Sequence, residues 1–158
     1  EQITLQRGFD ITKSQQRPGP FPVVSSGGIF SHHSESACDG PGVVIGRKGS
    51  VGRVHWVPED YWPHDTTLWV KDFHGNDPEY VYWFLRSFPL LDYESSTANP
   101  SLNRNRLHPV EVMWPERSLQ AELVDRVKGI FALCDSFEAA GGRQDSAASA
   151  LAAALTQA

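Results

Sequence analysis

Short apolar runs alternate with polar turns over the first half of the chain. Each run is three to six residues long and rich in β-branched side chains, which is typical of strands. The runs that predict strands are Phe21–Ser25, Val43–Ile45, Val54–Val57 and Thr66–Lys71. Residues 7–20 and 32–42 are polar and lack any period, so they predict loops, and Ser26-Gly27-Gly28 predicts a turn. We expect Val110–Met113 to return to the sheet.

Two later segments have helical spacing instead. Asp77 and Pro78 are the residue types preferred at the cap and first position of a helix. The apolar residues that follow recur every three or four positions, at Val81, Phe84, Leu85 and Phe88. From Leu119 a second apolar stripe predicts an amphipathic helix, which Gly141 and Gly142 would weaken or interrupt. The pattern divides the chain into a domain over residues 1–115 and a helical region over residues 116–158.

The composition is that of a globular protein with one well-buried domain and an appendage. The chain has 158 residues, of which 40% are hydrophobic, and no apolar run approaches the ~20 residues of a membrane span. It begins at Glu1 without a leader, which indicates a fragment of a longer protein. Cys38 and Cys134 form no Cys-x-x-Cys pair, so we expect neither a disulfide framework nor a zinc ribbon, and a cytoplasmic location.

The charge is unevenly distributed along the chain. The net charge of -5 is unfavourable for a nucleic-acid binder. Residues 1–56 and 101–110 each carry a net +2, whereas residues 57–100 carry -6 and predict a solvated acidic face. A basic face is therefore compatible with the acidic total.

Residues 43–54 (VVIGRKGSVGRV) combine three glycines and three cations between two apolar runs. The glycines permit positive φ and a close backbone approach, while Arg47, Lys48 and Arg53 suit a polyanion. The order of residues does not match the phosphate-binding pattern G-x-x-x-x-G-K-[ST], and no G-x-G-x-x-G follows a strand. The stretch predicts a polyanion site other than a nucleotide cradle.

Further cations and amides lie in the polar loops, where recognition residues often sit. Arginine pairs well with guanine, and asparagine or glutamine with adenine. Ordinary polar loops with scattered cations would have the same composition, so this pattern alone leaves DNA contact and a structural role open. The candidate DNA-binding residues are Lys13, Ser14, Gln15, Gln16, Arg17, Ser26, Gly27, Arg47, Lys48, Ser50, Arg53, Asn103, Arg104 and Arg106.

No pattern in the sequence predicts a catalytic or metal site. The histidines are irregularly spaced, and only His32-His33 with Cys38 and Asp39 suggest ligands, which loop histidines seldom become. Asn99-Pro100-Ser101-Leu102 only partly matches the Asn-Pro-Pro-aromatic motif of amino-methyltransferases. The remaining alternative is a protein-interaction module that uses the acidic span and the terminal helix.

Several segments together carry a resemblance to a known family. They are Leu5–Thr12, Phe21–Ile29, Val43–Gly52, Trp62–Thr67, and Pro115 with Gln120 at the start of the helix. In this order they resemble a target recognition domain of the specificity subunit of a type I restriction-modification system, over nearly the whole chain.

This resemblance implies an α+β fold, with a twisted, mostly antiparallel sheet and a few packed helices, followed by a long helix. In such subunits two recognition domains each read one half of a bipartite site on double-stranded DNA. The subunit is not catalytic and docks a methyltransferase subunit and a restriction subunit, which use S-adenosylmethionine and ATP. Only one recognition unit is present in this chain, and Gly141-Gly142 falls where the family's spacer helix is continuous.

The resemblance also suggests how the candidate residues divide between roles. We expect Arg47, Lys48 and Arg53 to contact phosphates or a groove of the duplex, and Ser26 and Gly27 to give a close backbone approach. The expected base readers are Lys13, Gln15, Gln16, Asn103, Arg104 and Arg106. A second recognition domain, a homodimer partner or another subunit would pack on the helix through Leu123, Val127, Ile130, Phe131 and Cys134.

Overall fold

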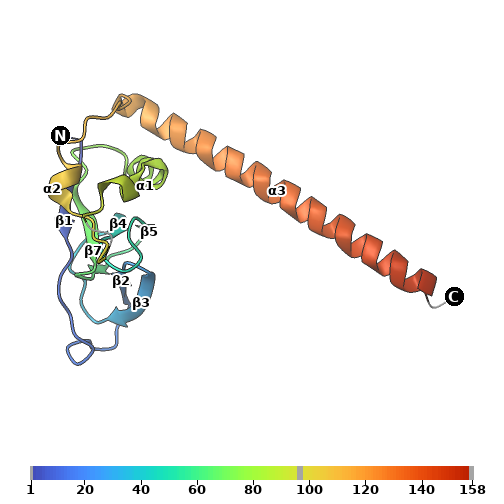
Figure 1. Ribbon diagram of the computed structural model, residues 1–158, viewed down its shortest axis with the longest axis horizontal. Coiled ribbons are helices and arrows are strands. Elements are labelled where there is room, and N and C mark those ends of the chain that lie inside the picture. The colour runs from blue at the N-terminus through green and yellow to red at the C-terminus, as the bar shows by residue number, and fades with distance from the viewer. Residues whose placement is uncertain (1, 96–97, 157–158) are drawn as a thin grey trace. The chain divides into compact units, whose positions relative to one another are not determined.

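Figure 1 shows a computed structural model of the chain, which describes the backbone of residues 2–95 and 98–156 and side chains as far as residue 139. The chain forms two compact units, Glu1–Ala121 and Glu122–Ala158. The strands are β1 (Thr4–Arg7), β2 (Phe21–Ser25), β3 (Gly28–His33), β4 (Gly42–Gly46), β5 (Val54–Val57), β6 (Trp62–Pro63) and β7 (Thr67–Asp72). The helices are α1 (Pro78–Ser87), the 3-10 helix η1 (Leu90–Tyr93), α2 (Arg104–Leu107) and α3 (Arg117–Thr156).

The described strands form two sheets. The larger one has the order β1-β7-β4-β5, and all of its neighbours are antiparallel. The smaller one has the order β3-β2-β6, in which β2 and β3 form an antiparallel hairpin and β6 runs parallel to β2. The α+β fold with mostly antiparallel strands, followed by a long helix, is confirmed.

Strand β4 is buried on both faces, which explains its unbroken apolar sequence. Because successive side chains of a strand point to opposite faces, Val43 and Ile45 enter one core and Val44 enters another. The first core is completed by Val81 and Leu85 of α1, which contacts β4 and β5. The second core contains Val24 of the smaller sheet, together with Cys38, Val57 and Tyr61. β4 therefore holds the rigid base of the loop that follows it.

The four predicted strands are confirmed to within a residue or two, whereas β1, β3 and β6 were missed. β3 is an edge strand whose residues are largely polar, and β6 has only two residues, so neither produces an apolar run. His32 and His33 consequently lie in a strand and not in the predicted loop. The prediction of a strand at Val110–Met113 was wrong: the backbone there is irregular and Met113 is 96% exposed.

Helix α1 begins as its sequence predicts. Asp77 lies at the N-cap, where its Oδ1 accepts a hydrogen bond from the backbone N–H of Tyr80 at 2.9 Å, and Pro78 takes the first helical position. Val81 and Leu85 are buried, while Phe84 packs edge-on against Trp114 with ring centroids 4.7 Å apart. The apolar stripe thus anchors both the sheet and the segment that leads to α3.

Gln120 fixes the first turn of α3 within the first unit. Its fully buried amide accepts a hydrogen bond from the backbone N–H of Asp77 at 2.8 Å and donates one to Oδ1 of Asn76 at 2.8 Å. The same Asn76 oxygen accepts from Nε1 of Trp114 at 2.9 Å. A fully buried amide is tolerated here because both its oxygen and its NH₂ group make hydrogen bonds. The helix therefore starts at a defined position relative to α1.

Helix α3 continues through Gly141 and Gly142 as far as Thr156. In its part beyond Ala121 whose side chains are described, Val124 is the one buried residue, and Val127 is half-buried. Leu123, Ile130 and Phe131 are exposed, as is Cys134. These residues recur every three or four positions and so share one face of the helix.

Candidate nucleic-acid interface

The loop between β4 and β5 is a tight turn closed by its own backbone. The N–H of Gly46 donates to the carbonyl of Arg53 at 2.7 Å, and the N–H of Gly52 donates to the carbonyl of Gly46 at 2.9 Å. Gly52 has φ of +76°, a conformation that favours glycine. A Cβ on Gly46 would lie 2.0 Å from the carbonyl oxygen of Ser50. These glycines allow the turn to close and hold its cations at a fixed place on the sheet.

The turn between β2 and β3 lies beside this loop. A Cβ built on Gly27 would be 4.0 Å from Oγ of Ser50, and one on Gly49 would be 3.3 Å from Oγ of Ser26. The backbone of Ser26 is held on both sides, by Oγ1 of Thr66 at 3.3 Å and by Nε2 of His55 at 2.9 Å. The structure therefore brings three predicted contact residues, Ser26, Gly27 and Ser50, next to one another.

The segment before α2 pairs with the same loop. The N–H of Leu102 donates to the carbonyl of Arg47 at 2.9 Å, and the backbones of Ser101 and Lys48 form an isolated antiparallel β-bridge. Asn103 then caps α2, since its Oδ1 accepts from the N–H of Asn105 at 3.0 Å. Although more than 50 positions separate them in sequence, Arg47 and Lys48 thus lie beside Asn103 and Arg104.

A groove of about 550 Å³ runs between these elements and β1. Its polar walls include three arginines, Arg7 of β1, Arg47 of the β4–β5 loop and Arg104 of α2. Leu68 and Leu102 line it as well, and both are buried. We call this feature the arginine groove. Arg7 was not among the residues predicted from the sequence.

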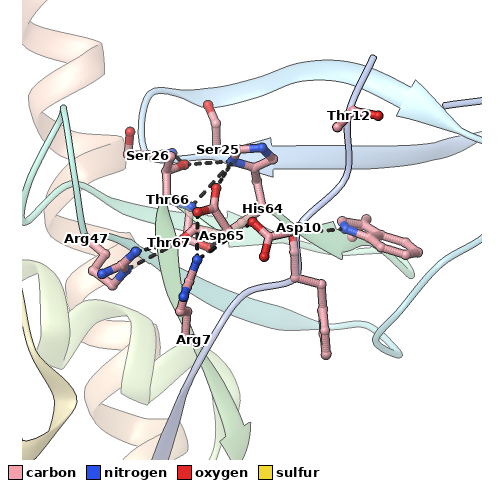
Figure 2. A network of polar contacts seen from close by, with 12 residues as sticks. Arg7, Asp10, Thr12, Ser25, Ser26, Arg47, His64, Asp65, Thr66 and Thr67 are labelled. Carbon is pink, nitrogen blue, oxygen red and sulfur yellow. Dashed lines mark hydrogen bonds and ion pairs between the residues drawn. The ribbon is translucent and has the colours of Figure 1, made fainter. Parts of the chain in front are cut away.

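Figure 2 shows how Asp65 holds two of these arginines. Its carboxylate pairs with Nη2 of Arg7 at 2.8 Å, and its backbone carbonyl accepts from Nε and Nη2 of Arg47 at 3.2 and 3.0 Å. Burial, and then the like charge of Arg7, lower the pKa of the Arg47 guanidinium. Nδ1 of His64 lies 3.1 Å from the same carboxylate and 3.0 Å from Oγ1 of Thr66. Asp65 is thus the centre of a polar network between β1 and β7.

Lys48 and Arg53 differ from Arg47 in being exposed and unengaged. Within the residues that the structure describes, neither side chain makes a hydrogen bond or an ion pair with the protein. Arg104 is likewise exposed and unpaired in that part of the chain. Arg106, in contrast, donates from Nη1 to the carbonyl of Glu94, which ties its side chain to the preceding segment.

The loop at residues 12–17 contributes to a second depression, distinct from the arginine groove. Ser14, Gln15 and Arg17 line a depression of about 400 Å³ together with His33 and Glu35. Oε1 of Gln15 accepts from both N and Oγ1 of Thr12 at 2.8 Å, which closes the loop. His33 and Gly28 lie at opposite ends of β3, and a six-residue strand spans ~17 Å. The structure therefore separates this loop from the turn at Ser26 and Gly27.

The remaining residues of that loop differ from one another in exposure. Lys13 is exposed, whereas Nε2 of Gln16 is buried and has no partner among the described atoms. A buried amide N–H without an acceptor is uncommon and costs stability. Lys13, Ser14, Gln15, Gln16 and Arg17 thus form one cluster, and the groove residues form another.

In the part of the chain that is described, no three His, Cys, Asp or Glu side chains gather as a metal ion would require. Over residues 2–95 and 98–156, no helix is both long and apolar enough to cross a membrane.

Comparison with known proteins relates this geometry to one kind of subunit. No family model matches the chain. The type I restriction enzyme EcoprrI specificity subunit of Escherichia coli is 22% identical over 130 residues, which cover 82% of this chain and 31% of that protein. The chain thus spans about a third of the length of this curated relative.

Two solved structures share the fold. The S subunit of the type I restriction-modification system from M. genitalium matches 80% of this chain and 36% of its own, with a TM-score of 0.68 and 14% identity. A chain from a structure of the type I R-M system, on complex assembly and conformational transition, matches 92% of this chain and 40% of its own, with a TM-score of 0.72 and 13% identity. The resemblance predicted from the sequence is confirmed, and this chain has the fold of a part of S subunits of type I restriction-modification systems.

Proposed function

We propose that the chain recognises a specific sequence of double-stranded DNA, as part of the specificity subunit of a type I restriction-modification complex. It reads one half of a bipartite target. The observation that carries the proposal is the convergence of cations from three separate elements beside the glycine-rich loop, in a unit with this fold. Convergent cations on a rigid sheet suit the phosphate backbone of a duplex.

The geometry suggests a role for each group of candidate residues. Lys48 and Arg53 contact phosphates, because their exposed side chains have no intramolecular bond to give up. Ser26, Gly27 and Ser50 allow the backbone of the adjacent turns to approach the duplex. Bases are read by the two clusters on either side, with Lys13, Gln15 and Gln16 in one and Asn103 and Arg106 in the other.

The amide groups of these readers are oriented by their own hydrogen bonds. Oδ1 of Asn103 accepts from the cap of α2, and Oε1 of Gln15 accepts from Thr12. In Asn103 and Gln15 the NH₂ group is left as a donor for an acceptor on a base edge. Fixing one end of an amide reduces the freedom that binding would otherwise cost.

The chain acts through partners and performs no chemistry itself. Methyl transfer with S-adenosylmethionine belongs to a methyltransferase subunit, and ATP-dependent cleavage belongs to a restriction subunit. α3 supplies the contact with a second recognition domain or a second copy, through Leu123, Val127, Ile130, Phe131 and Cys134. Ile130 is 62% exposed and Leu123 is 37% exposed, which favours a protein partner on this helix.

Duplex binding at two salt concentrations tests the proposal. We expect the chain to shift a mixed-sequence duplex at 50 mM salt and to bind more weakly at 200 mM. Replacing both Lys48 and Arg53 by alanine should flatten the plot of log affinity against log salt by about 1.8, since each phosphate contact contributes ~0.9. Because neither side chain bonds to the protein, this loss would not arise from unfolding.

Lys71→Ala is the matched control, because Lys71 is an exposed cation near the far end of β7. It should leave the slope unchanged. A chain that binds no duplex at 50 mM salt, yet retains a protein partner, would favour the interaction module over the DNA reader.

A further inference from the structure

The arginine groove has the properties of a binding site for an oxyanion. Arg7, Arg47 and Arg104 reach it from β1, the β4–β5 loop and α2. No acidic side chain lines it among the residues that the structure describes. Gln6, Ser95, Ser101 and Asn103 line it as well. The charged groups of the groove are therefore donors only, which suits a ligand that only accepts hydrogen bonds.

The positive charges in and beside the groove exceed the negative ones. Asp65 pairs with Arg7 at 2.8 Å, while Asp10 lies 3.7 Å from the same guanidinium and is 84% exposed, so water screens it. The like charges of Arg7 and Arg47 are close enough for one to lower the pKa of the other. Two neighbouring guanidiniums that repel one another are stabilised when an anion lies between them.

Asp65 orients Arg47 without neutralising it. The acceptor for Nε and Nη2 of Arg47 is the backbone carbonyl of Asp65, which carries no net charge. Nη1 of Arg47 has no hydrogen-bond partner within the described residues, and Arg104 has none for its guanidinium. One arginine is thus held in place and another is left unengaged at the same groove, and both retain donors for a ligand.

The chemical class of the ligand follows from these hydrogen-bond donors. Base edges present donors as well as acceptors, and a groove with three guanidiniums has little to accept the donors. A phosphodiester carries a delocalised negative charge and accepting oxygens, and arginine binds it with paired N–H groups.

We propose that the arginine groove binds one backbone phosphate of duplex DNA, with Arg7, Arg47 and Arg104 as donors and Asp65 as the positioning residue. The assignment of this phosphate to DNA rests on the proposed function, whereas the oxyanion site itself rests on the groove. Arg104 then anchors the duplex and does not read a base.

The first test measures duplex affinity against salt for Arg7→Gln and Arg104→Gln, with Lys71→Gln as the control. Each groove variant should lose about tenfold in affinity, equally for all duplex sequences, and should flatten the salt slope by ~0.9. The control should match the unmodified chain. Arg104→Gln carries the test if Arg7→Gln lowers the melting temperature by breaking the pair with Asp65. An unchanged slope in Arg104→Gln, or a loss confined to one base position, would overturn the proposal.

A second test separates this site from the proposed function. Inorganic phosphate is titrated into the ¹⁵N-labelled chain, and the Nε–H signal of Arg47 is followed by NMR. A saturable shift that is absent in Arg104→Gln would support the oxyanion site even if the chain bound no duplex. No shift at phosphate concentrations up to tens of millimolar would overturn it, even if the chain bound DNA through Lys48 and Arg53.

Discussion

The two units of the chain differ in how many of their apolar side chains are buried. The first unit, as described over residues 2–95 and 98–121, has two buried cores that share β4, and Leu68 in the first of these is 1% exposed, although Ile29, Phe30, Leu91, Met113 and Leu119 remain exposed. Over residues 122–139 of α3, the apolar side chains are mostly exposed, and Leu133 is 57% exposed. The first unit thus contains its own core, whereas the second keeps a surface that a helix of a soluble complex would bury against a partner.

The two units also differ in the sequence separation of the residues that their polar contacts join. In the first unit, Gln120, Asn76 and Asp65 each satisfy partners that are distant in sequence. On the described part of α3 beyond Ala121, polar contacts join residues three or four positions apart, as between Arg126 and Glu122 or between Ser136 and Leu133. Long-range polar contacts fix a tertiary structure, whereas contacts at this spacing support only the helix itself.

The largest expected difference is in the free energy of unfolding that a leucine-to-alanine substitution removes in each unit. Leu68→Ala should lower the free energy of unfolding by about 2 to 5 kcal/mol, because it removes buried methyl groups and leaves a cavity. Leu133→Ala should change it by about 0.5 kcal/mol or less, since that side chain is already in water. Urea unfolding monitored by tryptophan fluorescence measures both. Equal losses would show that α3 buries Leu133 in the isolated chain and would remove the contrast.

A smaller expected difference concerns the two cysteines. Burial, and then the charge of Asp39, raise the pKa of the Cys38 thiol to about 12. Because the thiolate is the reactive form, iodoacetamide at pH 8 should alkylate exposed Cys134 at least about a hundredfold faster than Cys38. Mass spectrometry of the two peptides measures the ratio. Comparable rates in the folded chain would contradict the burial of Cys38 between the sheets.

The same pKa shift has a consequence for stability at high pH. In the unfolded chain a cysteine ionises near ~8.5, whereas folded Cys38 stays neutral up to about 12. Between these two pH values the folded state therefore binds more protons than the unfolded state. The free energy of unfolding consequently falls as the pH rises from ~8.5 to about 12. Cys38→Ala should weaken that pH dependence.

The local elements could be predicted from the sequence because each is specified by neighbouring residues. Asp77 and Pro78 define the start of α1, and the run at Val43–Ile45 defines β4. β3 was missed because its side chains are mostly exposed or half-buried on both faces, with only His33 buried, and so give no apolar period. Val110–Met113 is apolar but unpaired, so its composition misled the prediction.

The site could be predicted only in part, because it depends on pairings distant in sequence. Arg47, Lys48 and Arg53 were predicted as contact residues from the glycine-rich loop that carries them. Arg7 and Asp65 were not, although they are joined at 2.8 Å, since 58 positions separate them. Asp65 was assigned to a solvated acidic face, yet it is mostly buried and pairs with a cation. Its place within Trp62–Thr67, one of the segments that carry the family resemblance, was the available signal.

Selection of bound duplexes from a random pool by the 158-residue chain tests sequence-specific recognition directly. We expect enrichment of a short shared sequence of a few base pairs. The double variant Lys48→Ala, Arg53→Ala should select the same sequence with weaker retention, since phosphate contacts position the duplex and do not specify it. Retention of duplexes without any shared sequence would contradict sequence-specific recognition, and selection of a different sequence by that variant would contradict the phosphate role of Lys48 and Arg53.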